Sequence, residues 1–275
     1  MTELVMRESR YISDQQFKQI REWLYQRSGI HLNATKKSLV TGRLYKRLSE
    51  LDLADFDAYL KVLRNPQQTQ EAELALNLLT TNETYFFREP KHFDFLQQLF
   101  EQGEISKRAR IWSAAASTGE EAFSIALSLA RQFGLHEPWQ VIGTDINTRV
   151  LQHARSSIYP LTDSHKIAPD LLKAFCLKGV GKDEGWFRLR PELRQHVQFQ
   201  QHNLMQPLQT SQKFDVIFLR NVLIYFELED KKHIVLNMLN ALKPGGYLLV
   251  GHSESIHGYD ARLLQQRPAC YRYQA

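Results

Sequence analysis

The chain has 275 residues, 43% hydrophobic and 24% charged, the composition of an ordinary globular protein with one large or two modest cores. No apolar run approaches the roughly 18 residues of a membrane span. The N-terminal sequence MTELVMRESRY has acids where a signal peptide needs a basic and then an apolar stretch. Cys176 and Cys270 stand far apart, which argues against a disulfide framework. We therefore expect a reduced, cytoplasmic protein.

The net charge of +5 is unevenly distributed. Between Trp23 and Ser49 there is no acid, whereas eight acids lie between Glu50 and Glu89. The basic residues of the first stretch are Arg27, Lys36, Lys37, Arg43, Lys46 and Arg47. Charge sorted in this way usually indicates a binding partner, and the alternative is a solvated basic face.

Residues 13–90 have the apolar spacing of helices. Ser13 and Gln16 fit a capping box at the start of the first helix, and Asn33 is the expected cap of the second. The second helix carries an apolar stripe beside its basic residues, made of Val40, Leu44, Leu48 and Leu51.

Two shorter helices are expected to begin at Asp55 and Gln68. The pattern breaks before Pro90, where a helix can restart because proline is tolerated in the first helical turn. We therefore expect an all-α N-terminal domain at 1–80, followed by a linker at 81–90.

From Arg110 onward, strands and helices alternate, which predicts a doubly wound, mostly parallel sheet of the α/β class. The strand candidates are 110–114, 140–144, 197–200, 214–219 and 247–250. The helix candidates are 120–133, 148–155 and 230–242, the last ended by Lys-Pro-Gly-Gly. Residues 270–273 are expected to close the sheet as an edge strand.

Residues 158–196 do not fit this alternation. They are too long for a simple loop and contain a strand-like run at 186–190 after the sequence GVGKDEG. We expect a small subdomain inserted here into the α/β domain, which spans 91–275.

The sequence IWSAAASTGEEAF at 111–123 predicts a buried strand, a turn of small residues and a helix that opens on two glutamates. Such a turn aims backbone N–H groups at a small ligand. It is neither a GxGxxG dinucleotide motif nor a phosphate loop, because Gly119 is its only glycine and no Gly-Lys-Ser/Thr follows. Acids at the helix start favour a cationic or zwitterionic ligand.

Three acids are candidates for contact with that ligand. Asp145 ends the second strand candidate, where an acid accepts hydrogen bonds from ribose hydroxyls; its alternative role is to cap the next helix. Glu120 and Glu121 lie at a helix N-terminus, where the dipole alone favours carboxylates by roughly 0.3–1 kcal/mol. We expect Glu120 rather than Glu121 to face the turn and bind an ammonium group.

Polar residues follow the fourth strand candidate. Arg220 and Asn221 come after four apolar residues, at the carboxyl end of a buried strand, where ligands bind in open α/β sheets. Tyr225 is a candidate for the same cleft, and the alternative is that it packs between sheet and helix.

The linker sequence TNETYFFRE has two interpretations. It is either an interdomain connection pinned by its aromatic residues or a segment folded over the ligand. In the second case its polar residues would take part in binding, and Arg88 would pair with a carboxylate. These residues are Asn82, Thr84 and Arg88.

Several kinds of chemistry have no motif in this sequence. The ten histidines show no HExxH or His/Cys spacing, so no metal is expected. There is no GxSxG elbow and no nucleophile with a base nearby. A reaction whose nucleophile is already reactive needs no such base.

Five motifs together resemble the chemotaxis receptor methyltransferase (CheR) family: TTNETYFFRE, SAAASTGEE, GTDIN, RNVLIYF and LKPGGYLLVGHSES. The resemblance covers nearly the whole chain, although the family's TGEEPYS reads TGEEAFS here. It implies a class I methyltransferase that uses S-adenosylmethionine to methylate glutamate side chains on cytoplasmic chemoreceptor helices. By matching positions, the cofactor contacts would be Asn82, Thr84, Arg88, Glu120, Asp145, Asn203, Leu204, Arg220 and Asn221.

The resemblance also implies individual roles. Asp145 would bind the ribose, Asn203 and Leu204 would lie beside the adenine, and Arg88 would approach the methionine carboxylate. A glutamate acceptor, with an ordinary pKa of about 4.3, is ionised at pH 7 and needs no general base. The enzyme then has to position and desolvate the partners. The residues expected to position them are Arg88, Arg220 and Tyr225.

Two surfaces would bind the receptor. Basic residues of the second helix would steer and register an acidic receptor helix; they are Lys36, Arg43, Lys46 and Arg47. The inserted segment resembles the family's antiparallel β-subdomain, whose loop carries three glycines in members that tether to a receptor C-terminal peptide. Here Gly179, Gly181 and Gly185 match. Glycines permit strand addition by a peptide, and a hairpin turn that needs positive φ is the alternative.

Other functions also fit the fold. A nucleic-acid methyltransferase tolerates the pI of about 9.1, but the fourth strand lacks an Asp/Asn-Pro-Pro-aromatic ending and the basic residues lack interleaved aromatics. We therefore expect no nucleic-acid partner. A small-molecule methyltransferase and a non-catalytic module that senses S-adenosylmethionine or S-adenosylhomocysteine remain alternatives.

Overall fold

The structure, a computed structural model, describes residues 11–274, and the chain divides into two compact units. The first unit comprises the chain up to Thr81 together with Tyr225–Glu227. The second comprises the remainder. No helix among the described residues is long and apolar enough to cross a membrane.

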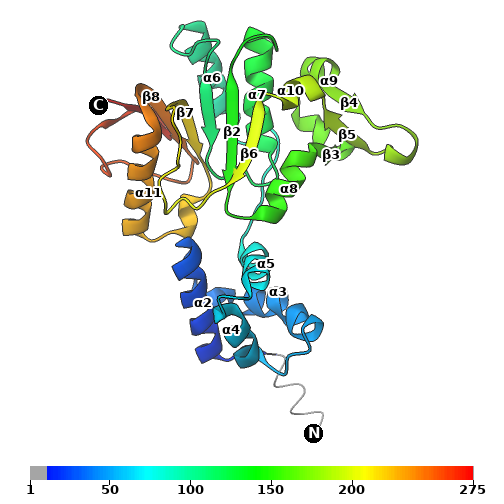
Figure 1. Cartoon of the computed structure of the whole chain (residues 1–275). Coiled ribbons are helices and arrows are strands. Elements are labelled where there is room, and N and C mark those ends of the chain that lie inside the picture. The colour runs from blue at the N-terminus through cyan, green and yellow to red at the C-terminus, as the bar shows by residue number, and fades with distance from the viewer. Residues whose placement is uncertain (1–10, 275) are drawn as a thin grey trace. The chain divides into compact units, whose positions relative to one another are not determined.

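The first unit is all helical, as expected (blue to cyan in Figure 1). The expected capping box is confirmed, because the Gln16 N–H donates to the Ser13 hydroxyl and the Ser13 N–H donates to the Gln16 side chain. Gly29, in the left-handed conformation, ends this first helix. The helices of the unit are α2 (Asp14–Ser28), α3 (Lys37–Glu50), α4 (Phe56–Arg64) and α5 (Thr69–Leu79).

The apolar stripe of the second helix is confirmed except at its end. Val40, Leu44 and Leu48 are buried. Leu51 is 37% exposed, because α3 ends at Glu50 and Leu51 is the residue that caps its C-terminus. Asn33 caps a short 3-10 turn, Ala34–Lys36, that leads into α3.

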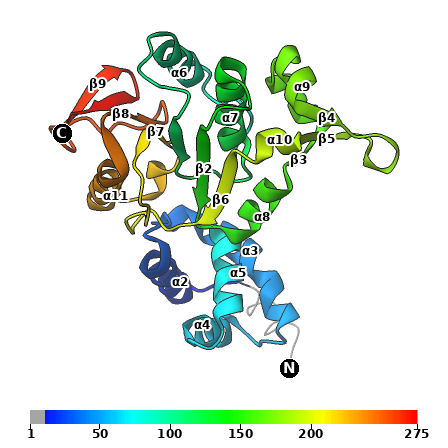
Figure 2. The same ribbon diagram turned by 45° about the horizontal axis from the view of Figure 1, so that its top comes forward.

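The second unit is built on a seven-stranded sheet in the order β6-β2-β1-β7-β8-β10-β9 (Figures 1 and 2). The first five strands in this order are parallel, which confirms the predicted doubly wound arrangement. They are β6 (Val197–Gln201), β2 (Gln140–Asp145), β1 (Arg110–Ser113), β7 (Phe214–Leu219) and β8 (Leu242–Val250).

Two details at one side of the sheet differ from the prediction. The predicted edge strand, β10 (Cys270–Tyr273), lies between β8 and a further antiparallel strand, β9 (Leu263–Arg267), which the sequence pattern did not indicate. The Lys-Pro-Gly-Gly segment belongs to β8 rather than to a turn, and the register with β7 shifts there. A Cβ at Gly246 would lie 2.9 Å from the carbonyl oxygens of Asp215 and Lys243, so this irregularity requires glycine.

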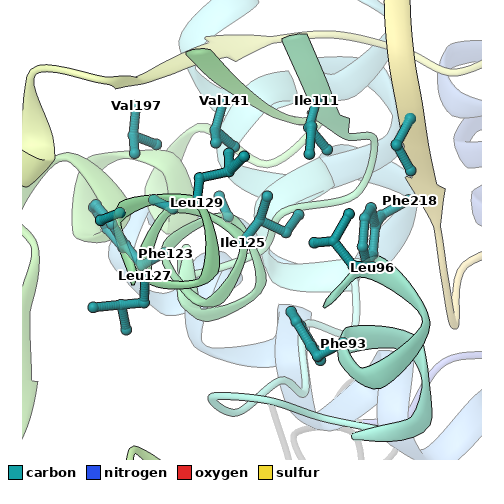
Figure 3. Close-up of a cluster of buried hydrophobic side chains, with 14 of the residues drawn as sticks. Phe93, Leu96, Ile111, Phe123, Ile125, Leu127, Leu129, Val141, Val197 and Phe218 are labelled. Carbon is teal, nitrogen blue, oxygen red and sulfur yellow. The ribbon is translucent and has the colours of Figure 1, made fainter. Parts of the chain in front are cut away.

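Two helices, α6 (Lys91–Glu101) and α7 (Glu120–Phe133), bury one face of the sheet. Figure 3 shows Ile111, Val141 and Val197 side by side on three strands, with Ile125 and Leu129 of α7 beneath them. Apolar residues recur on the facing sides of the strands and of α7, which explains why this face of the sheet is buried. The remaining long helices of the unit are α8 (Thr148–Ser156) and α11 (Leu228–Ala241).

The predicted insertion is a separate three-stranded antiparallel sheet in the order β3-β5-β4. Its strands are β3 (Ile158–Pro160), β4 (Cys176–Lys178) and β5 (Trp186–Leu189), and it carries the short helices α9 (Pro169–Phe175) and α10 (Pro191–Arg194). The loop between β4 and β5 extends away from both sheets (Figures 1 and 2). This insertion confirms the expected antiparallel subdomain.

Candidate cofactor-binding site

The segment between β1 and α7 is the strand–turn–helix that the sequence predicts. The N–H of Ala116 donates to the Thr144 carbonyl (2.8 Å), which anchors the turn to the end of β2. Gly119 has a φ of +100°, and a Cβ there would lie 2.9 Å from Ala154 Cβ and from the Tyr159 hydroxyl oxygen. Conformation and space therefore both require glycine at this position.

Asp145 is buried at the C-terminal end of β2, beside this turn. Its Oδ2 accepts from the Ser117 N–H (2.9 Å) and its Oδ1 from the Asn147 N–H (2.9 Å). Burial raises the pKa of Asp145, and these N–H donors oppose the rise. The helix-cap alternative is wrong, because the cap of α8 is Asn147, whose side chain accepts from the N–H groups of Arg149 and Val150.

The two glutamates at the start of α7 have different partners. The Glu120 carboxylate accepts from the Thr118 hydroxyl (2.7 Å) inside the turn, and burial raises its pKa. Glu121 accepts from Arg220 Nη1 (2.9 Å), and burial raises its pKa as well. Glu121 is thus neutralised by the protein itself. A cationic ligand group at the turn would offset the desolvation of Glu120.

Arg220 has a side chain that is only 1% exposed. Besides Glu121, its guanidinium donates to Glu89 Oε2 from Nε (3.3 Å) and Nη2 (3.0 Å), and Nη2 also donates to the Arg88 carbonyl. Its donors are committed to the protein, so the geometry favours an indirect role over direct contact with an acceptor carboxylate.

Asn221 follows Arg220 in the left-handed conformation, with a φ of +55°. Its N–H donates to Glu254 Oε2 (2.8 Å), and its side-chain amide donates to Glu89 Oε1 (3.2 Å). The Gly251 N–H donates to the same Glu254 oxygen (2.6 Å). Glu254 therefore ties the end of β7 to the end of β8.

The linker lies against the turn and against α7. The Ser117 hydroxyl donates to the Asn82 carbonyl (2.8 Å), and the Phe87 N–H donates to the Ser124 hydroxyl (2.9 Å). Ser124 belongs to α7, one turn after its start. Of the two interpretations of the linker, these contacts favour a segment folded onto the candidate site.

Within the linker, Arg88 is held by its own neighbours. Its Nη1 donates to the Glu83 carbonyl (2.8 Å), and its guanidinium lies 5.8 Å from the centre of the Tyr85 ring. Asn82, Thr84 and Arg88 are all half-buried. The structure thus places these three residues in the linker that contacts the turn, and their role in ligand binding stays a prediction.

Asn203 and Leu204 follow β6, which pairs with β2. The His202 N–H donates to the Asp145 carbonyl (2.9 Å), so these residues emerge beside Asp145. Leu204 is buried, and its carbonyl accepts from Asn237 of α11 (3.0 Å). The predicted cofactor residues of the second unit therefore gather at the carboxyl ends of β1, β2, β6 and β7.

Tyr225 ends a short 3-10 turn, Leu223–Tyr225, and belongs to the first unit, whereas the residues described so far belong to the second. Its positioning role stays a prediction.

The four predicted docking residues separate into two pairs. Lys36 and Lys46 are exposed. Arg43 donates to the carbonyls of Leu79 (3.1 Å) and Thr80 (3.0 Å), and Arg47 is paired with Glu71 through two hydrogen bonds (3.0 and 2.6 Å). The two arginines therefore stabilise the helical unit, which leaves the lysines as the more accessible charges.

The local backbone explains the three glycines of the inserted loop. A Cβ at Gly179 would lie 2.0 Å from the Asp183 carbonyl oxygen, and Gly181 and Gly185 have φ values of +59° and +87°. The hairpin alternative, a turn that needs positive φ, accounts for Gly181 and Gly185, and close approach of the Asp183 carbonyl accounts for Gly179, so peptide binding at this loop stays a prediction.

Residues 11–274 contain one group of potential metal ligands, in which Glu89, His92 and His252 each place one ligand atom within 4.8 Å of the others. The Glu89 oxygens already accept from Arg220, Asn221 and the His252 N–H. An ion at this place would lie against the buried guanidinium of Arg220, which opposes a cation. The sequence spacing could not indicate this group because its members are up to 163 residues apart.

Several residues of the site were not predicted from the sequence. They are the ones that hold other residues in place: Glu89, Ser117, Ser124, Tyr159 and Glu254. Ser117 lies inside the SAAASTGEE motif and Glu89 ends the linker motif, so their positions carried a signal. Their partners are distant in sequence, and no local pattern indicates those contacts.

Comparison with known proteins agrees with this geometry. The CheR methyltransferase all-alpha domain matches residues 15–80, and the CheR methyltransferase SAM binding domain matches residues 82–269. The chain belongs to the CheR methyltransferase family. The expected class I methyltransferase fold, with its helical N-terminal domain and its inserted β-subdomain, is confirmed.

Relatives in the family match over most of their length. The chain is 42% identical to a chemotaxis protein methyltransferase of Salmonella typhimurium, over 89% of this chain and 85% of the relative. It is 40% identical to a chemotaxis protein methyltransferase of Escherichia coli, over 98% and 94%. It is 41% identical to chemotaxis protein methyltransferase 2 of Pseudomonas aeruginosa, over 87% and 86%.

Proposed function

We propose that this protein transfers the methyl group of S-adenosylmethionine to glutamate side chains of chemoreceptors, forming methyl esters. One observation carries the cofactor assignment: the buried Asp145 carboxylate ends β2 and accepts from the turn that opens α7. The match of residues 82–269 to an S-adenosylmethionine-binding domain supports it. The chemoreceptor assignment is supported by relatives that are named chemotaxis protein methyltransferases.

In this proposal the residues at the carboxyl edge of the sheet hold the cofactor. Asp145 accepts from the ribose hydroxyls, and Asn203 and Leu204 flank the adenine. Glu120 binds the ammonium group, whose charge would offset the desolvation that raises the Glu120 pKa, and Arg88 approaches the carboxylate. The remaining proposed contacts are Asn82, Thr84 and Asn221, whereas Arg220, whose donors are committed to protein groups, acts indirectly.

When bound, S-adenosylmethionine supplies an electrophilic sulfonium methyl group. The acceptor glutamate has an ordinary pKa of about 4.3 and is already ionised at pH 7, so no residue of the chain has to act as a general base. The chain contributes orientation and exclusion of water, which can supply roughly 7–11 kcal/mol of the barrier. Tyr225 is the candidate for orienting the acceptor, and a Tyr225→Phe protein with unchanged turnover would remove it from the chemistry.

Receptor docking is proposed at the basic surface of the first unit. Lys46 is 83% exposed and Lys36 is exposed, whereas Arg43 and Arg47 have internal partners. The informative test is charge reversal at Lys36 and Lys46, because the same change at the arginines would also damage the fold. Unchanged receptor methylation by the double variant would contradict docking at this surface.

Tethering to a receptor C-terminal peptide is proposed at the β-subdomain. Strand β4 is an edge strand with exposed residues and can accept a further strand. A tether would raise the local concentration of enzyme near the substrate helices. Calorimetry with receptor C-terminal peptides tests this, and absence of binding would count against it.

The decisive experiment is transfer of labelled methyl from S-adenosylmethionine to receptor-containing membranes, followed by alkali. Release of labelled methanol indicates an ester and supports the proposal. Alkali-stable label would indicate methylation of another group, and binding of S-adenosylmethionine without transfer would support the sensing module.

A further inference from the structure

Arg88 lies between two residues in the left-handed conformation. Phe87 has a φ of +54° and Glu89 a φ of +55°, and neither is glycine. Bulky residues adopt this conformation only where the surrounding structure imposes it, and such positions cluster at ligand sites. The turn that presents Arg88 is therefore held by specific contacts on each side.

On one side, the Phe87 N–H donates to the Ser124 hydroxyl (2.9 Å). On the other, the Glu89 carboxylate accepts from Arg220 at Oε2 (3.0 and 3.3 Å) and from the Asn221 amide at Oε1 (3.2 Å). The His252 N–H donates to the same Oε1 (3.2 Å). Glu89 thus has one oxygen committed to the end of β7 and the other to the ends of β7 and β8.

The same arginine grips the backbone beside Glu89. Arg220 Nη2 donates both to the Glu89 carboxylate and to the Arg88 carbonyl. Because the guanidinium is planar and rigid, these contacts fix the carboxylate and the peptide group relative to each other. Movement of the Glu89 side chain would therefore move the Arg88 backbone.

Glu89 and Glu121 are the two carboxylate partners of Arg220. Burial works to raise the pKa of Glu89, but contacts with His92, Arg220 and Asn221 together hold the pKa well below its usual range. Burial instead raises the pKa of Glu121, the other partner of Arg220. Glu89 accepts from two nitrogens of the buried guanidinium, Nε and Nη2, whereas Glu121 accepts from Nη1 alone.

We propose that Glu89 is a positioning residue for cofactor binding: clamped by Arg220 and Asn221, it fixes the strained turn that presents Arg88 to the methionine carboxylate. This inference rests on the proposed function, in which Arg88 binds the cofactor. In this inference Glu89 acts on cofactor binding through Arg88.

The test is calorimetric titration of the full chain with S-adenosylhomocysteine, using a double-mutant cycle. Arg88→Ala and Glu89→Gln are each expected to weaken binding about tenfold, or about 1.4 kcal/mol. Because Glu89 acts through Arg88, the double variant is expected to bind about as weakly as Arg88→Ala alone. Asp94→Asn, which removes an exposed charge from the first turn of α6, is the matched control and should bind like the unsubstituted protein.

Each of the following results would overturn the inference. Unchanged affinity of Glu89→Gln would overturn this inference and leave the proposed function intact. A double variant weakened by the product of the two single effects would do the same, because it would indicate that Glu89 has an independent structural role. No binding by the unsubstituted protein would remove the proposed function and this inference with it. If Glu89→Gln does not fold by circular dichroism, Ser124→Ala releases the other side of the turn, and its unchanged affinity would equally contradict the proposal.

Discussion

Each unit of the molecule pairs an arginine with carboxylates, and the two clusters differ in what they join. In the first unit, Arg47 donates to Glu71, and the Tyr59 hydroxyl donates to the same carboxylate (2.7 Å). These residues come from α3, α4 and α5. In the second unit, Arg220 joins Glu89 of the linker and Glu121 of α7.

The backbone around the two clusters differs accordingly. The Arg47 cluster connects residues in regular helices, whose conformation is favourable without it. The Arg220 cluster holds Glu89 and Asn221 in the left-handed region, which costs about 1–3 kcal/mol for each such residue. The same chemistry thus fastens helix to helix in one unit and maintains strained loops in the other, where the cluster borders the candidate cofactor site.

Removal of each arginine should give the largest difference between the two clusters, in both the free energy of unfolding and cofactor affinity. Arg220→Ala leaves Glu89 and Glu121 buried without a counter-charge, so we expect a loss of about 3–5 kcal/mol in unfolding free energy and loss of S-adenosylhomocysteine binding. Arg47→Ala should cost about 1–3 kcal/mol, because Arg47 is 16% exposed and Tyr59 still donates to Glu71, and should leave affinity unchanged. Urea denaturation and calorimetry measure both, and a cofactor defect in Arg47→Ala would contradict the comparison.

Two glycines with positive φ in the second unit compare a position packed at the candidate site with one that is open. Gly119→Ala should destabilise by about 2–4 kcal/mol, because the left-handed conformation costs about 1–2 kcal/mol and the Cβ would also press against Ala154 and Tyr159. Gly103 has a φ of +71°, but a Cβ there would have nothing within 4 Å. Gly103→Ala should therefore lose only the free energy of unfolding that the left-handed conformation costs. Thermal melting compares them; equal losses would show that the contacts around Gly119 are unimportant.

Two buried tyrosines give a smaller and more selective test. The Tyr159 hydroxyl donates to the Thr118 carbonyl (2.8 Å) in the cofactor turn, and the Tyr59 hydroxyl donates to Glu71 in the helical unit. Replacement of either by Phe should cost about 1 kcal/mol of stability. Only Tyr159→Phe should also weaken S-adenosylhomocysteine binding, and the reverse result would mean that the turn does not depend on this hydroxyl.

The smallest expected effect is a proton release on binding. Burial raises the pKa of Glu120, so its protonated form contributes stability that is present below the ordinary pKa and is lost as pH rises through the raised pKa. A bound ammonium group would lower that pKa, so binding should release a fraction of a proton just above about pH 4.3 and none at high pH. Calorimetry in buffers of different ionisation enthalpy detects this, and Glu120→Gln should abolish it.

The sequence predicted the parts of the structure that depend on local patterns. The capping box at Ser13 and the five parallel strands were found because their signals lie within a few residues or in buried apolar runs. Strand β9 was missed because its residues are mostly exposed and do not alternate. The order of β9 and β10 depends on pairing between distant segments, which a local pattern does not contain.

The same limit applies to the candidate site. Asp145 and the turn at Gly119 could be singled out in the sequence because Asp145 ends a strand and the turn follows one. Glu89 was not, because its partner Arg220 lies 131 residues away. Arg43 and Arg47 were placed on a basic surface because sequence shows charge but not whether a side chain folds back onto its own helices.

The inserted subdomain is not an interchangeable cassette. Its first strand carries Tyr159, whose ring packs edge-on to Phe86 of the linker (4.9 Å between ring centres) while its hydroxyl holds the Thr118 carbonyl. A chimera that exchanges residues 158–196 between relatives would therefore also exchange a residue that supports the turn before α7. Grafts of the subdomain should begin after Tyr159, so that the host protein keeps the hydroxyl that hydrogen-bonds the Thr118 carbonyl.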